Sequence, residues 1–335
     1  MLILILLFFM LILSLIKGLF LVNRFKKSDV FANFSIIIAH KNDYQNLGNL
    51  LKSIGNINYP REKYEIIIVD DNSEQFLNIH NDFLFIKSNG EGKKKAIDTG
   101  IKASKFEWIV LTDADCIVPD NWLEIINLHI QNSSNTNMFI GYSPETYLNS
   151  FKYFKQLVNA INYAATTFLK LPFSCTGRNL VFDKKSFFEV DGYEGLFAYP
   201  AGDDKLLLNR FLKYRMEVSY MPAPKVYTKP VTQNDLKNQN LRRYGKFKMS
   251  TKKWQIGILF IGILLISIPF EIILLYPYSI LFLLLYISFI NMYIIFGCIL
   301  HKENVKLIYS LYTVFFPYYL IWHMLNSSFR KWSWK

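Results

Sequence analysis

The sequence is poor in the residues that build common cofactor and metal motifs. Its three cysteines, Cys116, Cys175 and Cys298, have the spacing of neither a metal site nor a disulfide framework, which indicates a reduced, cytoplasmic setting. Neither a Gly-x-Gly-x-x-Gly nor a Walker Gly-Lys-Ser/Thr motif follows the first predicted strand, so a dinucleotide-binding or P-loop protein is excluded. No internal repeat or low-complexity tract is apparent in the sequence.

Charge is nearly absent from the N-terminal stretch of the chain. Residues 1–22 contain one charged side chain, Lys17, and are long enough to cross a bilayer, for which about 20 apolar residues suffice. A cleaved signal peptide would begin with basic residues and end in small ones, and both features are missing. We therefore expect residues 1–23 to be an uncleaved anchor. The basic flank at Arg24, Lys26 and Lys27 places the following segment in the cytoplasm.

The C-terminal region, residues 251–335, is similarly depleted of charge. Between residues 255 and 300 the only charged side chain is Glu271, and "YPYS" at 276–279 divides the run into two predicted spans. A third apolar run, 307–325, contains Pro317 and precedes a basic tail, so it either spans or forms a re-entrant or interfacial helix. These features predict a multi-pass protein of the cell membrane.

The composition supports the same interpretation. The chain is 52% hydrophobic, which is too apolar for an ordinary soluble protein, and its formal net charge is +12. Basic residues cluster beside the apolar runs, where they would meet anionic membrane lipids. We therefore expect lipid rather than nucleic acid as the partner of this charge.

Residues 24–250 form a domain-sized block in which strands and helices alternate. Apolar runs predict strands at 34–40, 64–73, 83–88 and 107–115, and helical spacing or composition predicts helices at 44–57 and 92–104. This alternation predicts an α/β fold with a Rossmann-like, mostly parallel sheet that binds its ligand at the strand ends. Apolar spacing over 147–169 predicts a further helix, packed on this domain or on the bilayer.

Carboxylates follow three of the predicted strands, at Asp43, at Asp70-Asp71 and at Asp113-x-Asp115. Asp113 and Asp115 lie on one face of an extended chain, where they would repel each other unless a cation intervenes. Mg²⁺ prefers one or two carboxylates together with substrate phosphates. A polar turn that ends the strand is the alternative for each pair.

Six segments of the chain, in this order and spacing, resemble glycosyltransferase family 2 enzymes of the GT-A fold over about residues 34–250. They are "SIIIAHKND", "EIIIVDDNS", "GKKKAIDTG", "VLTDADCIVP", "TGRNLVFDKKSFFEVDGYEG" and "AGDDKLLLNRFLK". The resemblance implies that Mg²⁺ or Mn²⁺ binds at Asp115. It further implies a nucleotide-sugar site, for which the candidates are Asp43, Asp71, Lys93 and Asp113. Asp71 suits the imide N–H of uracil, so a UDP-sugar is the expected donor.

The same resemblance implies a catalytic base at Asp204, within Gly-Asp-Asp at 202–204. The alternative for these carboxylates is an acidic helix N-terminus. "QNLRRYGK" at 239–246 resembles the Gln-x-x-Arg-Trp segment of membrane synthases and lipid glycosyltransferases, with Gln239 and Arg242 in place and Arg243 where Trp is usual. We expect Arg242 to hold the diphosphate, or this segment to be a basic interfacial helix.

Together these observations predict a metal-dependent, inverting glycosyltransferase on the membrane that moves sugar to a lipid or lipid-linked acceptor. A chain with catalysis held between apolar segments needs a reason to be on the membrane, and such an acceptor supplies one. The alternatives are a processive polysaccharide synthase and a non-catalytic membrane scaffold with a degenerate transferase domain.

Overall fold

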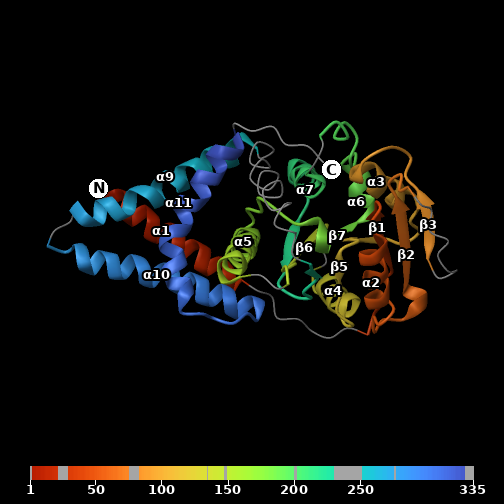
Figure 1. The fold of residues 1–335 in the computed structure, drawn as a ribbon, viewed down its shortest axis with the longest axis horizontal. Coiled ribbons are helices and arrows are strands. Elements are labelled where there is room, and N and C mark those ends of the chain that lie inside the picture. Colours follow the sequence, from red (N-terminus) through yellow and green to blue (C-terminus); the bar gives the residue numbers. More distant parts are fainter. Residues whose placement is uncertain are drawn as a thin grey trace. The chain divides into compact units, whose positions relative to one another are not determined.

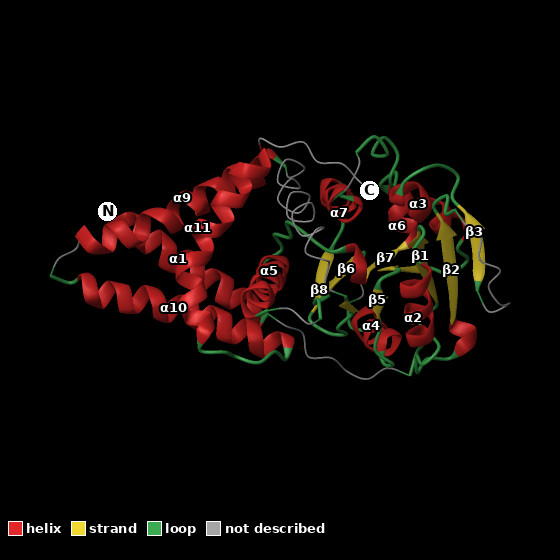
Figure 2. Ribbon diagram, in the orientation of Figure 1, coloured by secondary structure: helices red, strands yellow, loops and turns green. Residues whose placement is uncertain are grey.

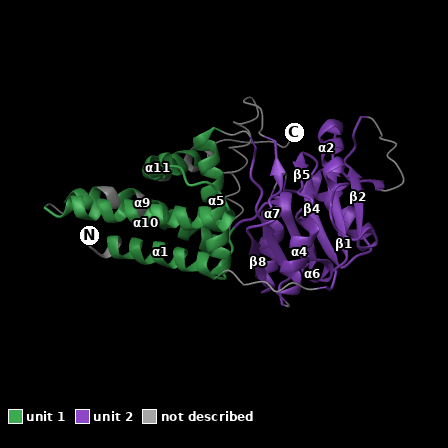
Figure 3. Cartoon of the chain, turned by 90° about the horizontal axis from the view of Figure 1, so that it is seen from below, with its two compact units in different colours: residues 1–22, 148–173, 231–335 green, residues 23–147, 174–230 purple. Residues whose placement is uncertain are grey.

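The computed structural model describes residues 2–21, 29–74, 83–133, 135–146, 149–199, 202–229, 251–274 and 277–328. The chain divides into two compact units, coloured separately in Figure 3. One, the catalytic unit, comprises residues 23–147 and 174–230. The other, the helical unit, comprises residues 1–22, 148–173 and 231–335.

A seven-stranded sheet forms the centre of the catalytic unit, in the order β3-β2-β1-β4-β7-β6-β8 (Figures 1 and 2). Strand β7 runs antiparallel to its neighbours β4 and β6, and the other neighbouring pairs are parallel. The predicted mostly parallel α/β sheet is therefore confirmed. The strands are β1 (Phe34–His40), β2 (Tyr64–Asp70), β3 (Leu84–Lys87), β4 (Trp108–Asp113), β6 (Met138–Gly141), β7 (Leu180–Asp183) and β8 (Val218–Met221).

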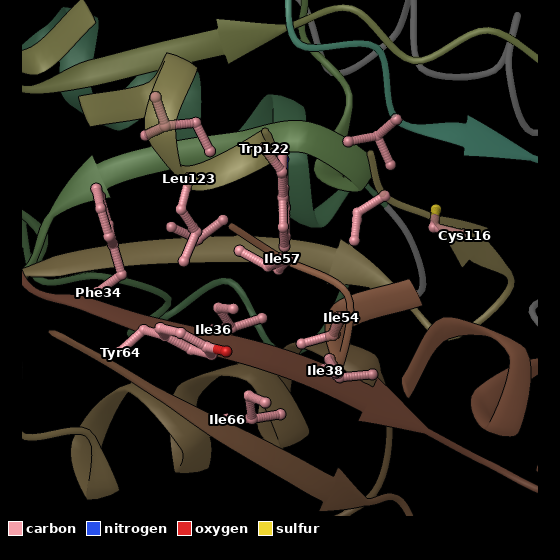
Figure 4. Packing of buried hydrophobic residues seen from close by; sticks show 14 of the residues in the cluster. Phe34, Ile36, Ile38, Ile54, Ile57, Tyr64, Ile66, Cys116, Trp122 and Leu123 are labelled. Atoms are coloured by element: carbon pink, nitrogen blue, oxygen red, sulfur yellow. The ribbon is translucent and has the colours of Figure 1, made fainter. Parts of the chain in front are cut away.

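One face of the sheet is covered by α2 (Tyr44–Ile54) and α4 (Trp122–Gln131). The buried apolar residues of these helices recur every three to four positions, which places them on one side of each helix. Alternate residues of β1, such as Ile36 and Ile38, point to this face and meet Leu123 and Ile54 (Figure 4). Trp122 is fully buried in the same cluster and donates its indole N–H to Asn179 at 3.2 Å. Burial of this kind stabilises the fold by roughly 1.5–3 kcal/mol per large apolar side chain.

Helix α3 (Lys93–Ala103) packs on β1 and β2. A methyl group at Gly100 would lie only 2.6 Å from Ile37 Cγ2 and 3.0 Å from Val69 Cγ2, so this close packing requires glycine. Ile37 and Val69 alternate with the residues that face α2, so these strands are apolar on both sides. This explains why they read as continuous hydrophobic runs in the sequence.

The remaining elements of the catalytic unit are short. Helices α6 (Lys184–Glu189) and α7 (Asp203–Lys213) contact β7 through Phe182, whose ring meets those of Phe187 and Phe211. A two-stranded antiparallel ribbon joins β5 (Cys116–Ile117) to β9 (Tyr227–Thr228). The ribbon connects the segment that follows Asp115 to a part of the chain more than a hundred residues later.

The helical unit contains α1 (Leu2–Phe20), α5 (Ser150–Phe168), α9 (Lys252–Leu274), α10 (Ser279–His301) and α11 (Ile308–Ser328). Helix α5 packs against α1, α10 and α11. At Gly18 of α1 a methyl group would lie 2.5 Å from the carbonyl oxygen of Ala165, so the two helices approach very closely there. The structure thus differs from the expected continuous domain at 24–250, because α5 buries its apolar face in the helical unit.

Among the described residues, α10 is the helix that is long and apolar enough to cross a membrane. The apolar part of α1, Ile5–Phe20, is shorter than that, so the predicted N-terminal span stays a prediction. The two predicted C-terminal spans and the third run do form helices, α9, α10 and α11. The length and composition of α10 therefore support one span, and the further spans belong to the proposal below.

Candidate active site

The carboxyl ends of the parallel strands bring the predicted site residues to one edge of the sheet. In the strand register, His40 lies opposite Asp70, and Ala39 lies opposite Asp113. The three predicted strands β1, β2 and β4 therefore end side by side, as expected for parallel strands. This edge is where ligands dock in open α/β sheets.

Lys93, the first residue of α3, joins this edge to α7. Its Nζ lies 2.7 Å from Asp113 Oδ1 and 3.2 Å from Asp203 Oδ2. Burial lowers the pKa of Lys93, but the charges of the neighbouring carboxylates outweigh it and raise the pKa above its ordinary value. Lys93 is therefore a permanent cation between two carboxylates that lie 90 positions apart in the sequence.

Asp203 and Asp204 lie in the first turn of α7, where Gly202 precedes the helix in a left-handed conformation with φ +83°. Both aspartates are buried, and Asp204 Oδ1 accepts a hydrogen bond from the Lys205 N–H at 2.7 Å. The helix N-terminus expected from the sequence is thus present. The ion pair between Asp203 and Lys93 also places this helix end at the strand edge. An acidic helix N-terminus and a catalytic carboxylate are therefore compatible interpretations of this pair.

Gly177 lies against the same group of charges. A methyl group at this position would lie 3.2 Å from Asp203 Oδ2 and 3.9 Å from Lys93 Nζ. Glycine therefore leaves the space in front of the acidic pair free of a side chain.

The carboxyl group of Asp115 is close to that of Asp113, and neighbouring charges of both signs act on it. Burial raises its pKa, the charge of Asp113 raises it further, and Arg178, Lys93 and a hydrogen bond with Thr228 lower it. Two carboxylates that compete in this way suit a divalent cation, which would relieve their repulsion. Among the described residues no cluster of three or more His, Cys, Asp or Glu could hold a metal by itself. One or two carboxylates, such as Asp113 and Asp115, are the protein ligands that Mg²⁺ takes when substrate phosphates complete its site.

Asp71, just beyond β2, is buried and accepts a hydrogen bond from the Gly92 N–H at 2.7 Å. Burial raises its pKa, and this hydrogen bond opposes the rise. Because Gly92 immediately precedes Lys93, this hydrogen bond connects Asp71 to the start of α3. Asp43 is half-buried at the start of α2 and accepts from Asn46 at 2.9 Å. The structure thus brings Asp71, Lys93 and the two carboxylate pairs together at this edge, with Asp43 just beyond β1. The pairs are Asp113 with Asp115, and Asp203 with Asp204.

Two predicted residues, Gln239 and Arg242, lie outside the described residues. A cation that the sequence reasoning missed is Arg178, in the Gly177–Asn179 turn. It lowers the pKa of Asp115 and lies 3.8 Å from Glu145. Its segment, "TGRN", contributes only to the family resemblance at the level of sequence. The carboxylates it meets are distant in the chain, so no local pattern marks it.

A mostly parallel sheet with an acidic carboxyl edge and a helix-borne acidic pair defines a GT-A-type glycosyltransferase domain. The sequence profile of glycosyl transferase family 2 matches residues 35–190. This match confirms the resemblance to glycosyltransferase family 2 that was found in the sequence.

Two known proteins are similar to parts of this chain. Glycosyltransferase AglE of Haloferax volcanii is 26% identical over 176 residues, which is 50% of this chain and 55% of that protein. Poly-beta-1,6-N-acetyl-D-glucosamine synthase of Staphylococcus epidermidis is 31% identical over 94 residues, 26% of this chain and 23% of that protein. The chain thus spans about half of the first relative and a quarter of the second.

A solved structure shares the fold over almost the full length. It is the mannosyltransferase PcManGT from Pyrobaculum calidifontis in complex with GDP-Man and Mn²⁺, with a TM-score of 0.58. The match covers 97% of this chain and 95% of that one at 14% identity. At this identity the likeness concerns the fold.

Proposed function

We propose that the chain is a membrane-bound, inverting glycosyltransferase that moves a sugar from a cytoplasmic nucleotide-sugar to a lipid or lipid-linked acceptor. The observation that carries this proposal is the ion-pair network of Asp113, Lys93 and Asp203 at the strand edge. Through it, Lys93 joins the Asp-x-Asp pair to the first turn of α7, so that a cation suited to a diphosphate and the proposed base Asp204 belong to one edge of the sheet.

Asp204 is the proposed general base. An acceptor hydroxyl is a poor nucleophile, and a carboxylate within hydrogen-bond reach can take its proton during attack on the anomeric carbon. Asp204 is buried in the first turn of α7, where its Oδ1 accepts a hydrogen bond from the Lys205 N–H at 2.7 Å. Asp203 forms an ion pair with Lys93 at 3.2 Å, so its charge is already balanced by that lysine. A single displacement inverts the anomeric centre.

Asp115 is the residue that would hold a divalent cation, and Asp113 beside it is proposed to face the nucleotide. When bound, Mg²⁺ or Mn²⁺ would neutralise the departing diphosphate. Lys93 supplies a fixed positive charge at the same place, and Arg242 is the proposed further contact to the diphosphate. Gln239 is proposed as a neighbouring residue that binds the nucleotide-sugar. The Mn²⁺ and GDP-Man of the similar mannosyltransferase support a donor of this class.

Asp71 and Asp43 are the proposed contacts to the nucleoside. Asp71 Oδ1 accepts from Gly92, so Oδ2 can accept the imide N–H of uracil. This geometry supports a UDP-sugar as donor.

Apolar exposure supports a membrane location for the helical unit. Large hydrophobic side chains are exposed on α1, α9, α10 and α11, including Met10, Leu259, Leu284 and Phe315. Such surfaces are unfavourable in water and suit hydrocarbon. We therefore propose a multi-pass arrangement in which residues 1–23 and 251–335 anchor a cytoplasmic catalytic domain.

Membranes that contain the chain, incubated with a panel of radiolabelled nucleotide-sugars, test this function. We expect metal-dependent label in the organic phase. Asp204→Asn should reduce transfer by roughly two to four orders of magnitude while donor binding stays near wild type. Asp203→Asn is the matched control and should retain more transfer. Normal transfer by Asp204→Asn would refute the assignment of the base.

The match to the polysaccharide synthase supports a second candidate, processive polymerisation. Long polymer in the aqueous phase would favour it. If neither product nor metal-dependent hydrolysis of any nucleotide-sugar is found, the scaffold alternative holds.

A further inference from the structure

The helical unit contains a buried lysine that the proposed transfer chemistry does not use. Lys155 of α5 is 8% exposed, and its Nζ donates a hydrogen bond to Tyr319 Oη of α11 at 2.7 Å. The ammonium also lies 4.6 Å from the ring centroid of Tyr319 and 5.9 Å from that of Phe151. Its partners are thus one phenol and two aromatic faces.

No carboxylate forms an ion pair with Lys155 in the part of the chain that the structure describes. The acidic side chain Glu303 of the same unit is instead hydrogen-bonded to Tyr153. An aromatic face contributes about 0.5–2 kcal/mol to a cation, whereas burial of an unpaired charge costs several kcal/mol. The protein therefore leaves a net positive charge in an enclosed place, and a bound anion would balance it.

Aromatic rings surround this charge. Phe151 meets the rings of Tyr312 and Tyr319 at 5.1 and 5.2 Å between centroids, and Tyr319 meets His323 at 4.3 Å. These groups come from two helices, α5 and α11, that are far apart in the sequence. The site is thus built by tertiary packing, with a cation, a hydroxyl and flat apolar walls.

The surroundings indicate which anion fits. Helix α11 exposes large apolar side chains at Leu311, Phe315 and Trp322, on which a hydrocarbon chain can lie. A free nucleotide would gain nothing from such a surface. A phosphate group attached to a lipid satisfies both the buried ammonium and the apolar exterior.

We propose that Lys155 and Tyr319 bind the phosphate group of a membrane lipid that serves as, or carries, the acceptor. This inference rests on the lipid acceptor of the proposed function. Lys155 supplies the charge, the Tyr319 hydroxyl orients the phosphate, and the ring of Phe151 lines the site.

Equilibrium binding of farnesyl phosphate to the full chain in detergent tests this site, with farnesol as the probe that lacks the phosphate. Lys155→Met should weaken farnesyl phosphate binding by at least about tenfold, the worth of a hydrogen bond to a charged group, and leave farnesol binding unchanged. Lys155→Arg keeps the charge and should retain most of the affinity. Tyr319→Phe should weaken binding by a few-fold.

The matched control is Lys253→Met, because Lys253 is an exposed lysine at the start of α9 in the same unit. It should bind farnesyl phosphate as the wild type does. Equal losses in both Met variants, or wild-type affinity in Lys155→Met, would overturn the site. Competition by inorganic phosphate as strong as that by farnesyl phosphate would overturn the lipid as its source.

The fold and the proposed function are checked separately. Lys155→Met removes an unbalanced charge, so its melting temperature without lipid should equal or exceed that of the wild type. Its affinity for UDP with Mn²⁺ should be unchanged. If the wild type transfers no sugar to any lipid but binds farnesyl phosphate through Lys155, the proposed function fails and this site stands. If the wild type transfers sugar to a lipid but its binding of farnesyl phosphate does not depend on Lys155, the proposed function stands and this site fails.

Discussion

Lys93→Met is the change that tests the charge network of the catalytic unit most directly. The methionine keeps the length of the side chain and removes its charge. Lys93 is 22% exposed at its side chain, Asp113 28% and Asp203 11%, so the carboxylates would lose a largely buried partner. Removing one partner of a buried pair costs about 3–5 kcal/mol, and the partial exposure places the expected loss in the free energy of unfolding near ~3 kcal/mol.

Lys102→Met on the same helix is the matched control. Its Nζ lies 2.7 Å from Asp98 Oδ2, the same distance as Lys93 from Asp113, but the Lys102 side chain is 60% exposed. An exposed pair of this spacing contributes only about 0.3–0.5 kcal/mol. Both variants therefore break an ion pair of 2.7 Å, but the Lys93 pair is more buried and Lys93→Met also breaks the second pair, with Asp203.

Urea unfolding monitored by fluorescence in detergent, with and without Mn²⁺, measures both effects. We expect Lys93→Met to lose several times more stability than Lys102→Met. We also expect Mn²⁺ to stabilise Lys93→Met more than the wild type, because the cation then neutralises carboxylates that have lost their lysine. Similar losses in the two variants, or no extra response to Mn²⁺, would refute the reasoning.

Three further predictions concern the donor, the fold and the topology. Asp115→Ala should abolish metal-dependent UDP binding and Asp71→Ala should weaken it by ~1.5–3 kcal/mol, as measured by titration calorimetry; normal binding by Asp115→Ala would contradict the metal site. Burial lowers the pKa of His129 to about 4, against a backbone hydrogen bond with Ala223 that raises it. The unfolded state therefore binds the His129 proton more readily than the folded state. The contribution of neutral His129 to the free energy of unfolding is complete above pH ~6.5 and declines by about 3 kcal/mol as the pH falls toward 4. His129→Gln should show a shallower decline in urea unfolding between pH 7 and 4.5, and an unchanged slope would contradict it. Lys52 is exposed and the native cysteines are buried, so Lys52→Cys provides a labelling site that stands out from them. This cysteine should resist an impermeant maleimide on intact cells and react after permeabilisation. Labelling of intact cells would reverse the topology.

Much of the catalytic unit could be predicted because its information is local. A run such as "FSIIIAH" is apolar on both faces, and such a run is typical of a parallel strand covered by helices. The polar residues that end β1, β2 and β4 must share an edge once the strands are parallel. The antiparallel β7 was not predicted, because strand direction depends on a long connection and not on the residues of the strand.

The helical unit shows the limit of the same reasoning. Apolar runs predicted helices at α9, α10 and α11, and these helices are present. The place of α5 remained open between the domain and the bilayer. Only its packing against α1, α10 and α11 decided this, because an amphipathic pattern specifies a buried face and not the partner that covers it.

The sequence by itself determined the α/β class, the family resemblance and the candidate residues of the site, because hydrophobic period and motif order depend on neighbours along the chain. Only the tertiary structure decided which charges meet. Lys93 pairs with Asp113 and Asp203, Arg178 acts on Asp115, and Lys155 is enclosed with Tyr319 without a carboxylate partner among the residues that the structure describes. Electrostatic interaction depends on distance in space and on burial, and neither quantity is encoded in the spacing of residues along the chain.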